Sequence, residues 1–159
     1  MAGWSVIDPQ VLRALDLFER FTDDELVEVA TYVTRERFRR NELIIAEGTA
    51  GDRLFFILGG EVRVSRSIPG VGEEALAILP AGSYFGEMAL FGEQTRSADV
   101  YADRTSELLV LRIDEFKALL EQRPELASKF LWAASRTLAD RLRAANAKVT
   151  FLSAAGQFG

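Results

Sequence analysis

Residues 84–100 read YFGEMALFGEQTRSADV, and this stretch says more about the chain than any other. Gly86 precedes one short helical turn that begins with the carboxylate of Glu87. Such a turn exposes free backbone N–H groups, which is how a helix N-terminus cradles a phosphate. Arg96 and Ser97 follow at the start of the next expected strand and add a guanidinium and a hydroxyl as donors. Glu87 suits a ligand that presents hydroxyl donors beside its phosphate, and a sugar phosphate presents both.

Short β-type runs lie on both sides of this stretch. They recur about every ten residues between Gly, Pro, Asn and Asp turn signals, at residues 43–46, 54–58, 62–67, 75–79, 97–101 and 108–113. Gly59-Gly60 predicts a two-residue hairpin turn, and Asn41 predicts a left-handed turn residue. Many short strands without long helices between them favour a β-barrel or double-sheet roll over a βαβ sheet.

Helical patterns flank these strands. Asp8-Pro9 supplies an N-cap and a first-turn proline, and residues 22–25 form a capping box before an apolar face that runs from Leu26 to Val33. Near the other end, Asp114 caps a short helix, and Pro124 opens a longer one that runs to about residue 152.

The sequence therefore predicts a single α+β domain over residues 1–159. It consists of N-terminal helices, a jelly-roll-like β-roll of about eight short antiparallel strands, a short phosphate-binding helix and two C-terminal helices. We expect the roll over about residues 35–113, the C-terminal helices over about 114–152 and a frayed tail over 153–159.

The amino-acid composition argues against several classes of function. The 159 residues are 48% hydrophobic and 27% charged with a net charge of −5, which is ordinary for a soluble protein but poorly suited to binding a nucleic acid unaided. The chain has no His and no Cys, so the commonest acid–base group and the usual transition-metal ligands are missing. We expect no catalytic residue, no cofactor and no metal. No apolar run approaches the ~20 residues that cross a bilayer, so we expect a cytoplasmic protein without membrane contact.

The quoted stretch resembles the phosphate-binding cassette of the cyclic nucleotide-binding domains. That superfamily includes bacterial catabolite activator proteins, regulatory subunits of protein kinase A and cyclic nucleotide-gated channels. The resemblance extends from about Leu17 to Asn146 through an ordered series of short motifs at residues 17–18, 47–48, 54–57, 60–62, 80–82 and 123–126. An ordered series is far more specific than any one of its members.

The resemblance implies roles for individual residues. Glu87 would accept from the ribose 2′-hydroxyl, Arg96 would pair with the exocyclic phosphate oxygens, and Ser97 would donate to the same group. Backbone amides would complete the cradle, within the segment formed by Phe85, Gly86, Glu87, Met88 and Ala89.

The family's base-capping region falls near Arg141, with Leu142 and Ala145 as the next candidates. Arg141 is long enough to stack its guanidinium on a purine or to bond its edge. Stacking by an arginine distinguishes the two purines only weakly, because either of them offers a face. We therefore expect cAMP to bind more tightly than cGMP, but by less than about a hundredfold.

Two positions depart from the family pattern. Asp99 stands where relatives usually have a small or apolar residue, and strand alternation places it on the same face as Ser97. Its carboxylate would then face the phosphate, unless a bulge or local twist turns it out. Asn41 stands where relatives often have glycine, which should affect only a turn.

The last helix carries an apolar stripe close to a heptad pattern, made by Leu126, Phe130, Ala134, Leu138, Leu142 and Val149. Such a stripe can pack against the roll or against the same helix of a second copy in a parallel homodimer. We expect the helix to make contacts of both kinds.

We interpret the chain as a cAMP sensor whose C-terminal helices move on binding and signal to an unidentified protein effector. The alternatives are a regulatory fragment of a longer transcription factor, kinase or channel, a cyclic dinucleotide sensor, and a ligand-blind interaction module. A cupin-like enzyme is disfavoured because such sites usually need a His cluster. Met1 favours a free-standing sensor over a fragment.

Overall fold

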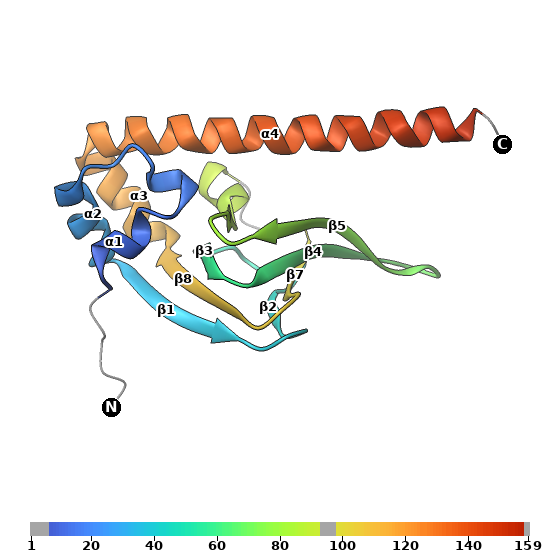
Figure 1. Ribbon diagram of the computed structural model, residues 1–159, viewed down its shortest axis with the longest axis horizontal. Helices are drawn as coiled ribbons and strands as arrows, with labels where there is room; N and C mark the ends of the chain where they lie inside the picture. The colour runs from blue at the N-terminus through green and yellow to red at the C-terminus, as the bar shows by residue number, and fades with distance from the viewer. Residues whose placement is uncertain (1–6, 93–97, 158–159) are drawn as a thin grey trace.

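The structure is a computed structural model that describes residues 7–92 and 98–157, and within them eight antiparallel strands form two sheets (Figure 1). One sheet has the order β1 (Val33–Phe38), β8 (Ser106–Arg112), β3 (Arg53–Gly59) and β6 (Tyr84–Phe85). The other has the order β2 (Leu43–Ile45), β7 (Asp99–Ala102), β4 (Glu61–Ile68) and β5 (Gly72–Pro80). The predicted β-roll is confirmed.

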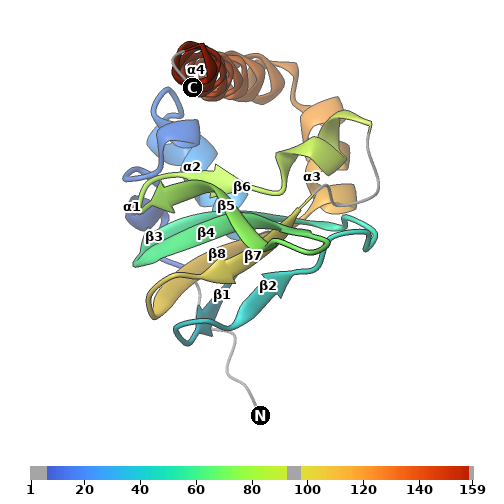
Figure 2. The same cartoon turned by 90° about the vertical axis from the view of Figure 1, so that its right-hand side faces the viewer.

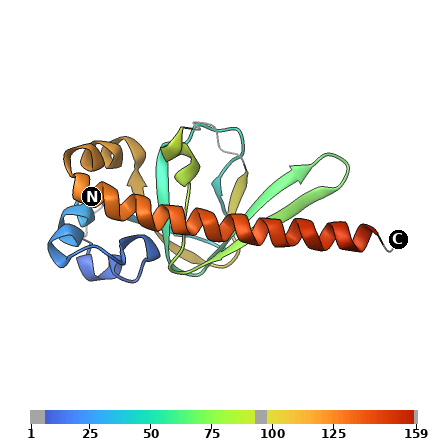
Figure 3. The same cartoon turned by 90° about the horizontal axis from the view of Figure 1, so that it is seen from above.

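Helices flank the roll at both ends of the chain. They are α1 (Pro9–Leu12), η1 (Asp16–Phe18) and α2 (Asp23–Ala30) before the strands, and α3 (Ile113–Gln122) and α4 (Pro124–Gly156) after them. The short η2 (Glu87–Phe91) lies between β6 and β7. Figures 1 and 3 show α4 running above the roll from the N-terminal helices to the β4–β5 hairpin. Figure 2 looks along α4, with the N-terminal helices to one side of it and α3 to the other.

The predicted starts of α1 and α2 are confirmed, because the predicted capping side chains form hydrogen bonds there. Asp8 accepts from the N–H of Gln10 at 2.9 Å, and Thr22 and Glu25 form a reciprocal capping box. In α3, by contrast, Asp114 lies in the first turn and Arg112 is the N-cap residue.

Strand β3 explains how the roll holds together, because it is buried on both faces. Leu54 and Phe56 pack into the core beneath the helices, whereas Phe55 and Ile57 pack into the core between the sheets. A strand buried on both faces reads as an unbroken apolar run, which is what residues 54–58 show. Strand β6 pairs with β3 and both of its residues are buried, so the segment that follows it starts from the core. This segment, residues 86–91, is the one expected to bind a phosphate, and we refer to it as the phosphate-binding segment.

Four local features differ from the sequence-based expectation. Val33, expected on a helix, begins β1, because pairing with β8 along the whole strand outweighs local helical spacing. Strand β6 has only two residues, too few for a periodic signal. Gly59-Gly60 is no hairpin, because β3 and β4 lie in different sheets. Helix α4 continues to Gly156, so much of the expected tail is helical.

Gly60 is required where the chain crosses between the sheets. It has φ 84°, which glycine adopts without a Cβ penalty, and a Cβ there would lie 2.7 Å from the carbonyl oxygen of Thr105. Asn41 has φ 66°, as predicted for a turn residue.

Candidate functional site

The phosphate-binding segment leaves the core through β6 and turns sharply at Gly86. Gly86 has φ 91°, a left-handed conformation natural to glycine, and it is the N-cap residue of η2. Glu87 opens η2, and its carboxylate is buried, with 4% of the residue exposed. A buried carboxylate needs partners, because burial without them is costly.

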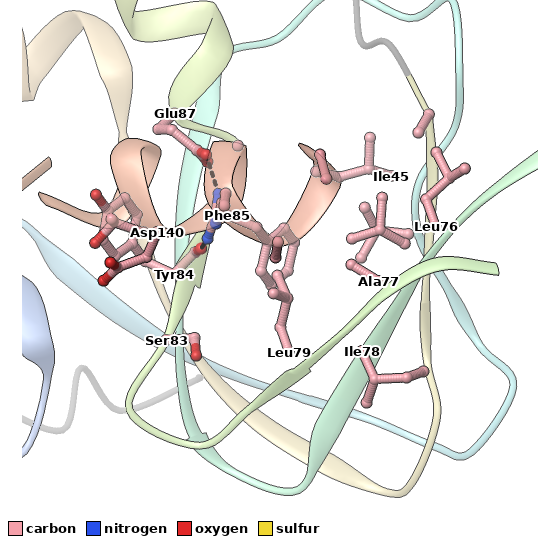
Figure 4. A pocket seen from close by; sticks show the side chains of 18 of the residues that line it. Ile45, Leu76, Ala77, Ile78, Leu79, Ser83, Tyr84, Phe85, Glu87 and Asp140 are labelled. Carbon is pink, nitrogen blue, oxygen red and sulfur yellow. Dashed lines mark hydrogen bonds and ion pairs between the residues drawn. The ribbon is translucent and has the colours of Figure 1, made fainter. Parts of the chain in front are cut away.

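A cavity of about 770 Å³ lies between this segment, the roll and α4. Its volume falls in the range of about 300–1,000 Å³ typical of small-molecule sites. Glu87 and Asp140 lie at one end, and the side chains of Ile45 and Leu76 lie at the other (Figure 4). The cavity therefore has a charged end beside the phosphate-binding segment and an apolar end over β2 and β5.

Arg141 of α4 reaches across the cavity to the charged end. Its guanidinium donates to Oε1 of Glu87 and to the backbone carbonyl of Tyr84, and lies over the Tyr84 ring at 5.4 Å from the centroid. The structure thus brings together Arg141 and Glu87, 54 positions apart in the chain. Arg141 was expected to stack on a purine. Here it binds the carboxylate expected to hold the ribose.

Tyr84 was missed by the sequence reasoning. Its ring is fully buried beneath Arg141, and this burial raises the pKa of the phenol above its ordinary value. The only signal in the sequence was its place next to Phe85. Phe85 stacks on Phe55 with ring centroids 4.9 Å apart, so the start of the segment is held by core packing.

Asp99 does not present its carboxylate freely to the cavity. Its Oδ1 accepts from the backbone N–H of Glu47 at 2.6 Å, which ties the start of β7 to the turn after β2. Burial alternates along β7, and Val100 lines the cavity, so Asp99 lies on the opposite face of this strand.

The other predicted ligand-binding residues are described in part. Gly86 and Ala89 line the cavity. Arg96 and Ser97 lie outside the described residues, as does the side chain of Met88.

The apolar stripe of α4 divides into two parts. Leu126, Phe130 and Ala134 are buried against the helical core, whereas Leu138, Leu142 and Val149 are exposed. Ion pairs reinforce the buried part: Lys129 Nζ lies 2.7 Å from Glu25 Oε1, and Arg123 pairs with Glu28. The first half of α4 is therefore clamped to the N-terminal helices, and Arg141 lies beyond the clamp.

Among the described residues, none of the helices combines the length and apolar character needed to cross a membrane.

Comparisons with known proteins agree with this geometry. The model of the cyclic nucleotide-binding domain family matches residues 35–123. "Glutaminase 1" of Bradyrhizobium diazoefficiens is 40% identical over 138 residues, which are 86% of this chain and 22% of that protein. "Cyclic AMP receptor protein" of Thermus thermophilus is 32% identical over 142 residues, which are 89% of this chain and 64% of that protein. The chain thus spans only part of each of these relatives.

Solved structures similar to this chain also contain cyclic nucleotide-binding folds. A cyclic nucleotide-binding domain from Methylobacillus flagellatus is 30% identical with a TM-score of 0.78, and the match covers 89% of this chain and 79% of that one. The catabolite activator protein of Thermus thermophilus is 33% identical with a TM-score of 0.71, over 87% of this chain and 63% of that one.

Proposed function

This chain belongs to the cyclic nucleotide-binding domain family, and from that premise we propose that it is a sensor of a 3′,5′-cyclic nucleotide that favours cAMP over cGMP. The observation that carries the proposal is the buried carboxylate of Glu87 at the charged end of the cavity, held by Arg141 of α4. A carboxylate in a phosphate site suits a ligand that also presents hydroxyl donors, and a ribose phosphate is such a ligand.

The ligand groups divide between the two ends of the cavity. The backbone amides after Gly86, together with Arg96 and Ser97, bind the cyclic phosphate. Glu87 accepts from the ribose 2′-hydroxyl while it keeps Arg141, because a carboxylate has about four lone-pair sites. The base occupies the apolar end, against Ile45 and β5.

Ligand binding changes the position of helix α4. Its second half, residues 138–156, forms one wall of the cavity through Arg141 and Ala145 and lies beyond the clamped part of the helix. A ligand that contacts this wall binds more tightly when the helix is closed over it, and this differential affinity shifts the population of helix positions.

A second copy of the chain is the partner best suited to the exposed stripe of α4. Leu138, Leu142, Val149 and Leu152 are between 36% and 61% exposed and, with Ala145, follow alternating steps of four and three residues. Such spacing forms the seam of a coiled coil, and a self-complementary seam suits a two-fold dimer. An unidentified protein effector then reads the position of the helices. No catalytic activity is proposed for this segment.

Isothermal titration of the purified chain with cAMP, cGMP and cyclic di-GMP tests the proposal. We expect one cAMP per chain and weaker binding of cGMP. If only cyclic di-GMP binds, the chain is a cyclic dinucleotide sensor. If none of the three binds to the folded chain, it is a ligand-blind interaction module, and the proposal is wrong.

A further inference from the structure

The hydroxyl of Tyr84 is a buried polar group that the proposed function leaves without a role. Tyr84 is 1% exposed, and among the described residues its hydroxyl has no hydrogen-bond partner. Arg141 lies over the ring and donates to the backbone carbonyl of Tyr84, so it holds the residue but does not bond the hydroxyl. A buried hydroxyl without a partner is rare, because it loses its bonds to water and gains none in return.

Thr137 of α4 is the neighbour best suited to accept from this hydroxyl. Burial raises the pKa of the Tyr84 phenol, and the hydroxyl of Thr137 opposes that rise, which places the two groups near each other. Thr137 donates to the backbone carbonyl of Ala133 at 3.2 Å, so its proton is already used while its oxygen keeps a lone pair for a donor. Both residues line the cavity, Tyr84 from β6 and Thr137 from α4.

Thr137 lies where the attachment of α4 changes. Ala134, about one turn earlier, is buried in the helical core, whereas Leu138 is exposed. In the proposed function, on which this inference rests, a ligand draws the second half of α4 closer to the roll. This motion carries Thr137 toward β6. A short movement is enough to turn a near contact between two hydroxyl groups into a hydrogen bond, because the bond depends steeply on its distance and angle.

We propose that Tyr84 is a positioning residue whose hydroxyl donates to Thr137 only when α4 closes over a bound ligand. In the arrangement of the structure the hydroxyl is buried without a partner among the described residues, which disfavours that arrangement. In the closed arrangement the same hydroxyl is paired. The pair therefore favours closure without touching the ligand, and it raises ligand affinity through the population of helix positions.

The test compares Tyr84→Phe, Thr137→Val and the double variant by titration with cAMP. Each single variant should weaken binding by about fivefold, which is typical of one neutral hydrogen bond. The double variant should also lose about fivefold, and not about 25-fold, because the two changes remove the same bond.

Two matched changes serve as controls and should leave the affinity for cAMP unchanged. Tyr101→Phe removes the hydroxyl of a tyrosine on β7, and Thr150→Val removes a threonine hydroxyl of α4 that also bonds a carbonyl one turn back. Neither residue lines the cavity.

Unfolding of the unliganded chain supplies a readout that separates positioning from packing. Tyr84→Phe removes a hydroxyl that has no partner among the described residues in that state, so the urea midpoint should stay at or above that of the wild type. A Tyr84→Phe variant that lowers both the midpoint and the affinity would make Tyr84 a packing residue and overturn the inference.

The remaining outcomes separate this inference from the proposed function. If the wild-type chain binds no cyclic nucleotide, the proposed function fails and the inference falls with it. If the wild type binds cAMP and both single variants bind it equally well, only the inference is wrong. Multiplied losses in the double variant, or a loss in Tyr84→Phe alone, would assign the hydroxyl a different acceptor, such as the carboxylate of Asp16, and would also overturn it.

Discussion

At the scale of single residues, the site centres on the carboxylate of Glu87. It lies at the start of η2, is buried and accepts from Arg141. Among the described residues its partner is Arg141, and a carboxylate with spare lone pairs can take a further donor from a ligand without breaking that bond. In the proposed function, the free energy of ligand binding and the position of α4 are coupled through this side chain.

The role of Glu87 is tested with a ligand that lacks the 2′-hydroxyl. Glu87→Gln should weaken cAMP binding through two losses, the ribose bond and the bond to Arg141. Only the first depends on the 2′-hydroxyl, so 2′-deoxy-cAMP should be weakened much less. A double-mutant cycle by calorimetry should give a coupling of about 1.5–3 kcal/mol for a charge-assisted hydrogen bond. Equal losses for both ligands would reject the ribose role.

Arg96 is tested by removing its charge. Arg96→Leu should abolish most cAMP affinity while the chain stays folded by circular dichroism. Loss of one partner of a desolvated charge pair costs about 2–5 kcal/mol, or roughly 30- to 5,000-fold in affinity. Arg104→Leu is the control, because Arg104 pairs with Glu61 on the surface and does not line the cavity. Binding within about threefold of wild type would remove Arg96 from the phosphate site.

At the scale of elements, α4 has two parts with different attachments. Up to Ala134 it is buried, and Leu126 and Phe130 each contribute roughly 1.5–3 kcal/mol by leaving water. From Leu138 onward its apolar side chains are exposed, and the bonds of Arg141 attach it to the phosphate-binding segment. In the proposed function, this second part is the part of the helix that a ligand repositions.

Arg141→Ala should release this second part. We expect cAMP affinity to fall about tenfold, because Glu87 loses its hydrogen bond from Arg141 and the cavity loses part of one wall. Amide exchange over residues 138–149 should become faster in the bound state. The matched change Arg143→Ala, at an exposed residue that pairs with Asp140 on the same helix and does not line the cavity, should do neither. Unchanged affinity together with unchanged exchange in Arg141→Ala would place the lid contact elsewhere.

The exposed apolar stripe on the second half of α4 predicts a dimer, and a charged side chain placed in that stripe should dissociate it. Leu142→Glu should shift a concentration-dependent dimer to monomer in analytical ultracentrifugation, since it buries a carboxylate in an apolar seam. Phe151→Glu is the control, because Phe151 is 72% exposed but lies off the seam. A wild-type chain that stays monomeric at high concentration would assign the stripe to a different protein partner.

At the scale of the whole molecule, ion pairs join the first half of α4 and its N-cap residue, Arg123, to the N-terminal helices. They are Lys129–Glu25, Arg123–Glu28 and Arg136–Glu19. Glu25 also completes the capping box of α2, so one carboxylate serves two helices that lie far apart in the sequence. These contacts make the two ends of the chain into one support for the roll.

Glu25→Gln should lower the free energy of unfolding by about 1–3 kcal/mol, because it removes the charge that Lys129 faces while leaving an oxygen for the cap. Urea unfolding measures the change. Asp24→Asn, at an exposed neighbour in the same turn, should change stability by less than about 0.5 kcal/mol. Equal effects of the two variants would show that the ion pair contributes no more than a surface charge.

The sequence by itself determined those features that depend on neighbours along the chain. The capping box at Thr22, the left-handed Asn41 and the turn at Gly86 into η2 all follow from local backbone chemistry. The ordered motifs also identified the family. Short strands at regular intervals were sufficient to predict a β-roll, because alternating burial leaves its pattern in the residues.

Only the tertiary structure decided how distant residues meet. It bound Arg141 to Glu87, tied Asp99 to the N–H of Glu47, and divided the stripe of α4 into a buried and an exposed part. It also paired β1 with β8 and made Gly59-Gly60 a crossing between sheets. In each case the partners lie far apart in the chain or on different layers. A periodic pattern records that a side chain is apolar or charged, but not which surface the folded backbone brings to it.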